Sequence, residues 1–161
     1  MATLTVTVKE AITLNNIDYG SERALDISSV NEVVKRVVTA STTECGLIGF
    51  ISAISGVGVT ANKVGYVAGI FDDGDVRYIR ITNLDSSNHI TLTFRDENNT
   101  ECRLKVAAGH SFIYPGDNSG GVKDTMHAAG SAITVSLNDL VDITAVADTA
   151  ACDVEVFVGS A

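Results

Sequence analysis

The sequence contains no tryptophan, one proline, four tyrosines and five phenylalanines. With so few aromatic rings, a core has to be built from valine, isoleucine, leucine and alanine. Threonine and valine recur in alternation along the chain, and both residue types favour strands. The single proline, Pro115, follows the apolar run 112–114 and is expected to end a strand there, because proline cannot donate a hydrogen bond to a sheet.

Cysteine is also scarce, with three residues that are odd in number and widely spaced: Cys45, Cys102 and Cys152. This count excludes a disulfide framework of the kind found in small secreted domains. Cys102 and Cys152 lie inside apolar alternation and are predicted to be small buried hydrophobic residues. The first eight residues lack the basic start and continuous apolar run of a signal peptide, so we expect synthesis in a reducing cytoplasm.

Basic residues are few, 11 against 20 acidic ones, and the formal net charge is −9. Such a surface repels phosphates, which argues against nucleic acid and against an anionic membrane as partners. No segment approaches the ~18 consecutive apolar residues of a membrane-spanning helix. With 45% hydrophobic residues, the chain is expected to form one packed domain over residues 1–161 that buries roughly 70% of its unfolded surface.

The clearest pattern is a hairpin in which apolar residues alternate with polar ones over 90–95 and again over 101–106. One register places apolar side chains together on one face and polar ones on the other; it pairs Phe94 with Cys102, Leu92 with Leu104, Ile90 with Val106, and Arg95 with Glu101. A one-residue slip would expose the apolar set. The sequence therefore predicts an antiparallel pair with one buried face and one face in water, on which Thr91 and Thr93 also lie.

Strands are predicted along the rest of the chain as well. The run 31–39 also fits a helical stripe, but its β-branched valines favour a strand. The predicted strands lie at 2–8, 31–39, 47–54, 64–70, 76–82, 112–114, 132–137, 141–147 and 153–158. With the hairpin, they indicate an all-β, antiparallel β-sandwich or jelly roll of about nine to eleven strands with little or no helix. Segment 1–14 is predicted to be an N-terminal strand or arm.

No motif for catalysis or cofactor binding is specific. Residues 56–61 match the dinucleotide fingerprint G-x-G-x-x-A, but only ten residues separate Ala61 from Asp72, too few for a crossover helix and a second strand. A loop is therefore predicted there. Asp72, Asp73 and Asp75 supply oxygen ligands for calcium but lack the EF-hand spacing, so a solvated turn is favoured.

The remaining candidates have equally simple interpretations. His89, His110 and His127 are too far apart to indicate a metal site, and we expect surface or hydrogen-bonded histidines. Asp117 and Asp124 could be considered as the carboxylate pair of a glycosidase. Nothing in the sequence fixes the separation of their carboxylates, so glycoside hydrolysis is not supported. Asn98–Thr100 fits a glycosylation acceptor but is interpreted as the hairpin turn. We therefore predict no catalytic residue, cofactor or metal, and no enzymatic activity.

Sheet edges need protection from unwanted pairing, and few charges are available to provide it. Basic residues predicted to guard edges are Lys9, Lys35, Arg36, Arg80 and Arg95. The valine- and alanine-rich strands 141–147 and 154–158 are poorly guarded. We therefore expect other copies of the chain to cover some of these strands.

Three segments together suggest a family: the opening 3–8, the run 76–84, and the hairpin leading into 108–112. In style and arrangement the chain resembles small β-rich virion proteins of tailed bacteriophages, especially marine and cyanobacterial ones. The resemblance implies a non-enzymatic head decoration (cement) protein, assembled in the host cytoplasm and located on the outside of the virion. Its implied partners are copies of itself, as a trimer, and the major capsid protein or another virion protein.

Alternatives remain open at this point. A tail or fibre subunit would share the same features. A carbohydrate-binding or adhesion module would share the sandwich but needs exposed aromatic side chains for stacking on sugar rings. An enzyme of cupin-like fold would require converging histidines and carboxylates.

Overall fold

The computed structural model describes residues 1–51, 65–114, 121–126 and 136–161, and these residues form 13 strands and no helix. The all-β fold class predicted from the sequence is confirmed. The strands are β1 (Ala2–Glu10), β2 (Thr13–Leu14), β3 (Ile17–Asp18), β4 (Ser21–Val30), β5 (Glu32–Ala40), β6 (Cys45–Ile51), β7 (Gly69–Asp72), β8 (Val76–Asn83), β9 (Ile90–Asp96), β10 (Glu101–Val106), β11 (Ser111–Tyr114), β12 (Leu140–Ala147) and β13 (Cys152–Ser160). No helix among these residues is long and apolar enough to cross a membrane.

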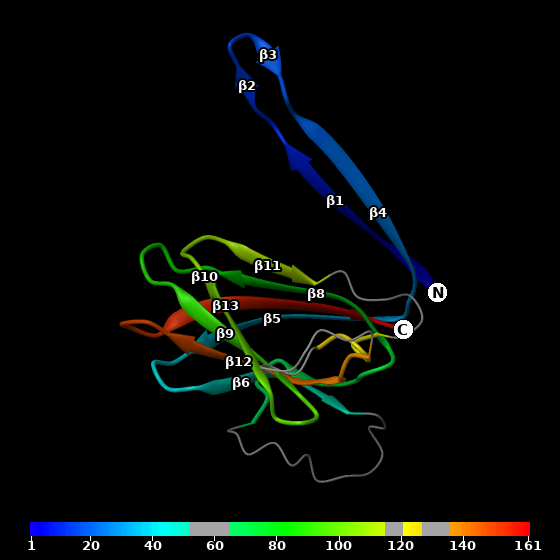
Figure 1. The fold of residues 1–161 in the computed structure, drawn as a ribbon, viewed down its shortest axis with the longest axis vertical. Helices are drawn as coiled ribbons and strands as arrows, with labels where there is room; N and C mark the ends of the chain where they lie inside the picture. The colour runs from blue at the N-terminus through cyan, green and yellow to red at the C-terminus, as the bar shows by residue number, and fades with distance from the viewer. Residues whose placement is uncertain (52–64, 115–120, 127–135) are drawn as a thin grey trace.

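Nine of the strands form two sheets that pack face to face as a sandwich (Figure 1). The five-stranded sheet has the order β10-β9-β12-β6-β7, and the four-stranded sheet has the order β11-β8-β13-β5. Side chains from both sheets fill the space between them, with Leu92 and Ile143 from one and Ile79 and Val156 from the other, all fully buried. This core of aliphatic side chains is the one expected for a chain without tryptophan.

The predicted hairpin has the predicted register, because β10 pairs with β9 in antiparallel fashion with Cys102 opposite Phe94 and Glu101 opposite Arg95. The predicted burial is only partly correct. Ile90, Leu92 and Phe94 are buried, but Cys102 and Leu104 are exposed because β10 is the edge strand of its sheet. On the other face, Thr93 and Arg95 are buried and do not lie in water.

Two further expectations about strands 141–147 and 153–158 have different outcomes. Both segments form strands, β12 and β13, and Cys152 in β13 is buried as predicted. Each of the two strands is internal in its sheet, with hydrogen-bonded neighbours on both sides. The premise that these strands have unprotected edges was therefore wrong, because strands of the same chain pair with both of their edges.

Several predicted features lie outside the described residues: the 56–61 motif, Pro115, Asp117, His127 and most of the strand at 132–137. Within the described ranges, 31–39 is confirmed as a strand, β5, and 47–54 begins as the buried strand β6.

The N-terminal segment forms a hairpin that projects away from the sandwich (Figure 1). Residues 2–8 are not a free strand, because β1 pairs with β4 over most of its length. The short strands β2 and β3 form the tip of this hairpin. Of these elements, β4 was not predicted from the sequence.

Candidate interaction surface

The projecting hairpin keeps one register from Leu4 to its tip, after a register shift between Ala2 and Leu4 at its base. In β1 and β4, Leu4 is opposite Ile27 and Glu10 is opposite Ser21. The amide of Tyr19 then donates to the carbonyl of Ile12 over 3.0 Å, and the tip pairs Leu14 with Ile17. Asn15 and Asn16 close the hairpin with φ values of 52° and 63°, the left-handed conformation that a two-residue turn of this kind needs and asparagine tolerates.

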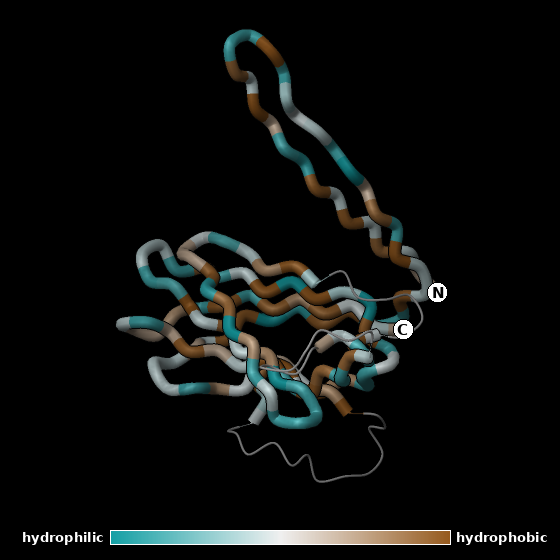
Figure 2. Tube along the Cα trace, viewed as in Figure 1, coloured by the Kyte–Doolittle hydropathy of each residue, from teal (hydrophilic) through white to brown (hydrophobic). Residues whose placement is uncertain are grey.

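This register places the large apolar side chains of the hairpin on a single face. Side chains alternate between the two faces along each strand, and residues opposite each other share a face. We call the exposed part of this face the apolar strip; it consists of Val8, Ile12, Leu14, Ile17, Tyr19 and Leu25, each between 47% and 59% exposed. Figure 2 shows hydrophobic stretches recurring along the projecting hairpin. The opposite face is polar and includes Thr5, Thr7, Lys9, Thr13, Asp18 and Glu22.

The base of the same face is covered by the protein's own sandwich. Leu4, Val6, Ile27 and Val30 pack around Tyr78 and Phe157, which lie on the outer face of the four-stranded sheet. The rings of Tyr78 and Phe157 meet edge to face with centroids 5.8 Å apart. Beyond this contact, a cleft of about 270 Å³ separates β1 from the sheet and is also lined by Arg80. The hairpin is thus anchored at its base, while the apolar strip continues into solvent.

An exposed apolar face on a two-stranded ribbon is physically unusual. An isolated hairpin is marginally stable in water, and complete burial of one aliphatic side chain contributes about 1.5–3 kcal/mol. Contiguous exposed apolar patches on soluble proteins mark surfaces that bind something else. Six half-exposed side chains on one ribbon face therefore form a candidate binding surface. Sequence reasoning placed Leu4, Val6 and Val8 on one face but did not identify the partner strand β4.

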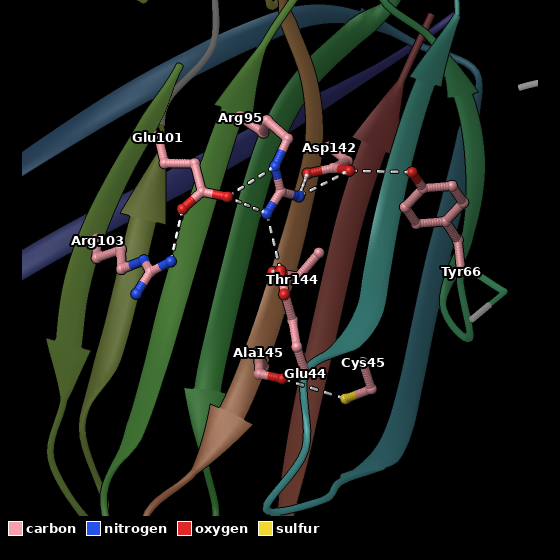
Figure 3. Close-up of polar contacts among 9 residues, drawn as sticks. All are labelled: Glu44, Cys45, Tyr66, Arg95, Glu101, Arg103, Asp142, Thr144 and Ala145. Carbon is pink, nitrogen blue, oxygen red and sulfur yellow. Dashed lines mark hydrogen bonds and ion pairs between the residues drawn. The ribbon is translucent and has the colours of Figure 1, made fainter. Parts of the chain in front are cut away.

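A second notable group of side chains is the ion cluster around Arg95 (Figure 3). The guanidinium donates to Asp142 over 2.8 Å, to Glu44 over 2.8 Å and to Glu101 over 2.6 Å. The Arg95 side chain is only 6% exposed and that of Asp142 only 4%. Three carboxylates from three parts of the chain thus meet one buried cation, which ties β9, β10 and β12 to the segment before β6.

Tyrosine and threonine hydroxyls complete this cluster. Tyr66 donates to Asp142 over 3.1 Å, and Thr144 donates to Glu44 over 2.7 Å. The Tyr66 ring lies directly over Gly49, where an added Cβ would be 2.7 Å from the ring, so a glycine is required there. Burial, followed by the charge of Asp142, raises the pKa of Tyr66, so its hydroxyl stays protonated as a donor.

Arg95 was predicted to guard an exposed edge, and this prediction was wrong. It lies on the internal strand β9, and its charge is buried and paired. Burial opposes the charge of Arg95, but the hydrogen bonds that it donates to Glu44 and Glu101 outweigh that effect and raise its pKa. A signal was present in the sequence, because Asp142 is the only charged residue in the apolar run 140–147.

The cluster makes stability depend on pH. The hydrogen bond from Arg95, followed by that from Arg103, holds the pKa of Glu101 below its ordinary value of 4.5. The resulting stabilisation is complete above that value and is lost as pH falls through the lowered pKa. We expect the free energy of unfolding to fall with acidification below about pH 4.5, and to fall less steeply in Glu101→Gln. Denaturant titrations from pH 7 to pH 3 measure both slopes, and equal acid slopes would contradict this role.

The other candidates from the sequence have structural roles. In the turn at 72–75, Asp73 is buried and its carboxylate lies 3.2 Å from the ammonium of Lys123, so the predicted solvated turn is wrong at this residue. His89 lies 3.3 Å from Asp148, and Nδ1 of His110 lies 2.8 Å from the carbonyl of Ala108, as expected for hydrogen-bonded histidines.

Neither metal binding nor a carboxylate pair gains support from these positions. In the part of the chain that the structure describes, no group of three or more histidine, cysteine, aspartate or glutamate side chains is arranged to hold a metal ion. The amide of Asp124 donates to the carboxylate of Asp139 over 2.9 Å. Residues 98–100 form the turn of the β9–β10 hairpin, with Asn99 at a φ of 62°.

Comparisons with protein-family models, with curated proteins and with solved structures found no match. The case for a function therefore rests on the surface itself. Of the two groups described, the ion cluster is buried and its charges are paired within the chain. The apolar strip is exposed to solvent, so it is the better candidate for binding another molecule.

Proposed function

We propose that this chain is a non-enzymatic structural protein that joins a larger assembly through the apolar strip of its hairpin. The observation that carries the proposal is the placement of six large apolar side chains on one exposed ribbon face. Burying such a face against a partner is favourable, and a projecting ribbon can reach a neighbouring molecule without moving the sandwich. Chemistry on a substrate is not needed to explain this feature.

We further propose that the assembly is the virion of a tailed bacteriophage and that the chain is a head decoration protein. This step rests on the sequence resemblance of segments 3–8, 76–84 and 108–112. The net charge of −9 favours the outer side of a shell over the side that faces DNA. The proposed partners are other copies of the chain, as a trimer, and the major capsid protein.

In such a role the protein acts through binding energy. A decoration protein that binds the assembled shell, but not its separated subunits, stabilises the shell by mass action. Many identical contacts on one particle multiply the effect of each. A tail or fibre subunit would use the same strip in the same way, and the two roles differ in the location of the protein on the particle.

The experiment is incorporation of full-length variants into virions of the phage that encodes the chain. The test variant replaces Ile12, Leu14, Ile17 and Tyr19 with serine, because these side chains form the exposed tip of the strip. We expect wild-type protein to sediment with heads and the particle-bound fraction of the variant to fall at least tenfold. Immunoblotting of purified particles measures the fraction, and particle imaging separates head from tail.

The matched control replaces Lys9 and Glu22 with alanine and Thr13 with serine on the polar face of the same hairpin. These changes shorten side chains on the side away from the strip, and incorporation should match that of the wild type. Absence of wild-type protein from particles would refute the virion role. Equal incorporation of both variants would refute the role of the strip. Substitution is preferable to deletion of residues 1–14, because the deletion would leave β4 without its partner strand.

A further inference from the structure

The apolar strip has a feature that restricts what it can bind. Fourteen large hydrophobic residues are exposed in the described part of the chain, and six of them form the strip. Two charged residues interrupt it at two successive pairs on this face of the ladder. Arg23 is opposite Val8, and Glu10 is opposite Ser21, so both charges lie on the strip face in the middle of the hairpin.

Only one of these two charges has a partner in the part of the chain that the structure describes. The carboxylate of Glu10 accepts a hydrogen bond from Ser21. Arg23 has no ion-pair or hydrogen-bond partner among the residues that the structure describes. Burying an unpaired charge is costly, so a protein that covers the strip has to place an anion near Arg23 and a cation near Glu10. It also has to present apolar side chains on both sides of these two charges.

A second copy of the strip satisfies each of these requirements. It has apolar residues toward its base and tip, and it has one cation and one anion at its middle. When two strips are centred on each other, Arg23 of each copy comes within reach of Glu10 of the other. The apolar ends then cover each other at the ~10 Å spacing of packed sheets.

The sandwich determines the direction of approach. At the base of the hairpin, the strip side is already occupied by the protein's own Tyr78 and Phe157. A partner ribbon in the same direction would bring a second sandwich into that space. A partner ribbon that runs in the opposite direction brings only its tip to the base of the first hairpin. The tip residues Leu14 and Ile17 of the partner would then lie at the cleft of about 270 Å³ beside Tyr78 and Phe157. The exposed stretch from Val8 to Leu14 spans roughly 20 Å, which is long enough for the tip of one copy to extend to the cleft of the other.

We propose that two copies of the chain associate by laying their apolar strips face to face in opposite directions. The inference rests on the proposed function, because it names the partner of the same surface. The contact has two-fold symmetry, so each copy uses the same residues and the contact closes on itself. In a trimeric decoration protein, this contact would join one trimer to the next.

The test is a charge exchange between copies, measured by sedimentation velocity on purified full-length protein without particles. Glu10→Arg gives the strip two cations, and Arg23→Glu gives it two anions, so each variant alone opposes pairing with itself. We expect the dissociation constant of each to rise about tenfold or more. In an equal mixture of the two, each cation faces an anion, and the dissociation constant should return to within about threefold of the wild-type value.

The control variants are Lys9→Glu and Glu22→Lys, which break an ion pair of 3.3 Å on the polar face of the same hairpin. They should pair as wild type does, because the polar face is turned away from the contact. Failure of the mixture to associate better than its components would overturn the pairing, as would a wild-type chain that stays at the mass of one subunit. In the second case, particle incorporation that still depends on the strip would leave the proposed function standing.

Discussion

Replacing Arg95 with methionine is expected to lower the free energy of unfolding by about 3–5 kcal/mol, because it removes the cation from a buried group of carboxylates. Asp142 would keep its charge at 4% exposure without the guanidinium that now binds both of its oxygens. Glu44 and Glu101 would lose the same partner. Methionine fills a similar volume, so the loss is one of charge pairing and not mainly of packing.

The matched control is Arg103→Met on the neighbouring strand. Arg103 also contacts Glu101, over 2.6 Å, but its side chain is 64% exposed. Exposed ion pairs contribute about 0–1 kcal/mol, so this variant should unfold close to wild type. Chemical denaturation at pH 7 measures both changes. If the two variants lost the same stability, the buried cluster would not be the interaction that stabilises this face of the sheet.

Replacing Gly121 with alanine is expected to lower the free energy of unfolding on the order of 3 kcal/mol, because two effects add at this position. The backbone has a φ of +65°, which disfavours any residue with a Cβ. The added carbon would also overlap the carbonyl oxygen of Asp73 and lie 2.8 Å from the carbonyl carbon of Gly74. The next amide, from Val122, donates to the same Asp73 oxygen over 2.8 Å, so the segment cannot move away without losing that bond.

Two other glycines separate these effects. Gly109 has a φ of +72° with open space around its Cα, so Gly109→Ala should cost only about 1 kcal/mol from backbone strain. At Gly65 an added Cβ meets nothing within 4 Å, so Gly65→Ala should change stability by less than about 0.5 kcal/mol. Thermal or denaturant unfolding of the three variants gives the order. A Gly121→Ala loss no larger than that of Gly109→Ala would show that the close approach to Asp73 has no energetic consequence.

How much the sequence reveals depends on whether a pattern constrains both faces of a strand. The register of β9 and β10 was predictable because apolar and polar sets alternate on both strands, and only one pairing satisfies both. Alternation does not tell whether a strand lies at an edge, so the exposure of Cys102 was missed. Alternation also does not tell whether other side chains cover the outer face of the five-stranded sheet, so the burial of Arg95 was missed.

The hairpin was only half predictable for a related reason. The alternation of Leu4, Val6 and Val8 indicated a strand, and the asparagines at 15 and 16 indicated a turn. In β4 only Leu25 and Ile27 continue an apolar alternation, and Ser21 and Arg23 occupy the same face toward the tip, so the pattern is short. The apolar strip appears only when the two strands are set opposite each other, since tertiary pairing brings its members together.

The central claim is that the apolar strip is covered by another protein copy in the assembled state. Hydrogen–deuterium exchange tests this most directly, because amides at a covered ribbon exchange more slowly than those of a ribbon in water. The amides of residues 8–25 should exchange more slowly in the assembled protein than in the dilute free chain, while those of the internal strands β12 and β13 stay unchanged. Equal exchange of residues 8–25 in the two states would contradict the claim.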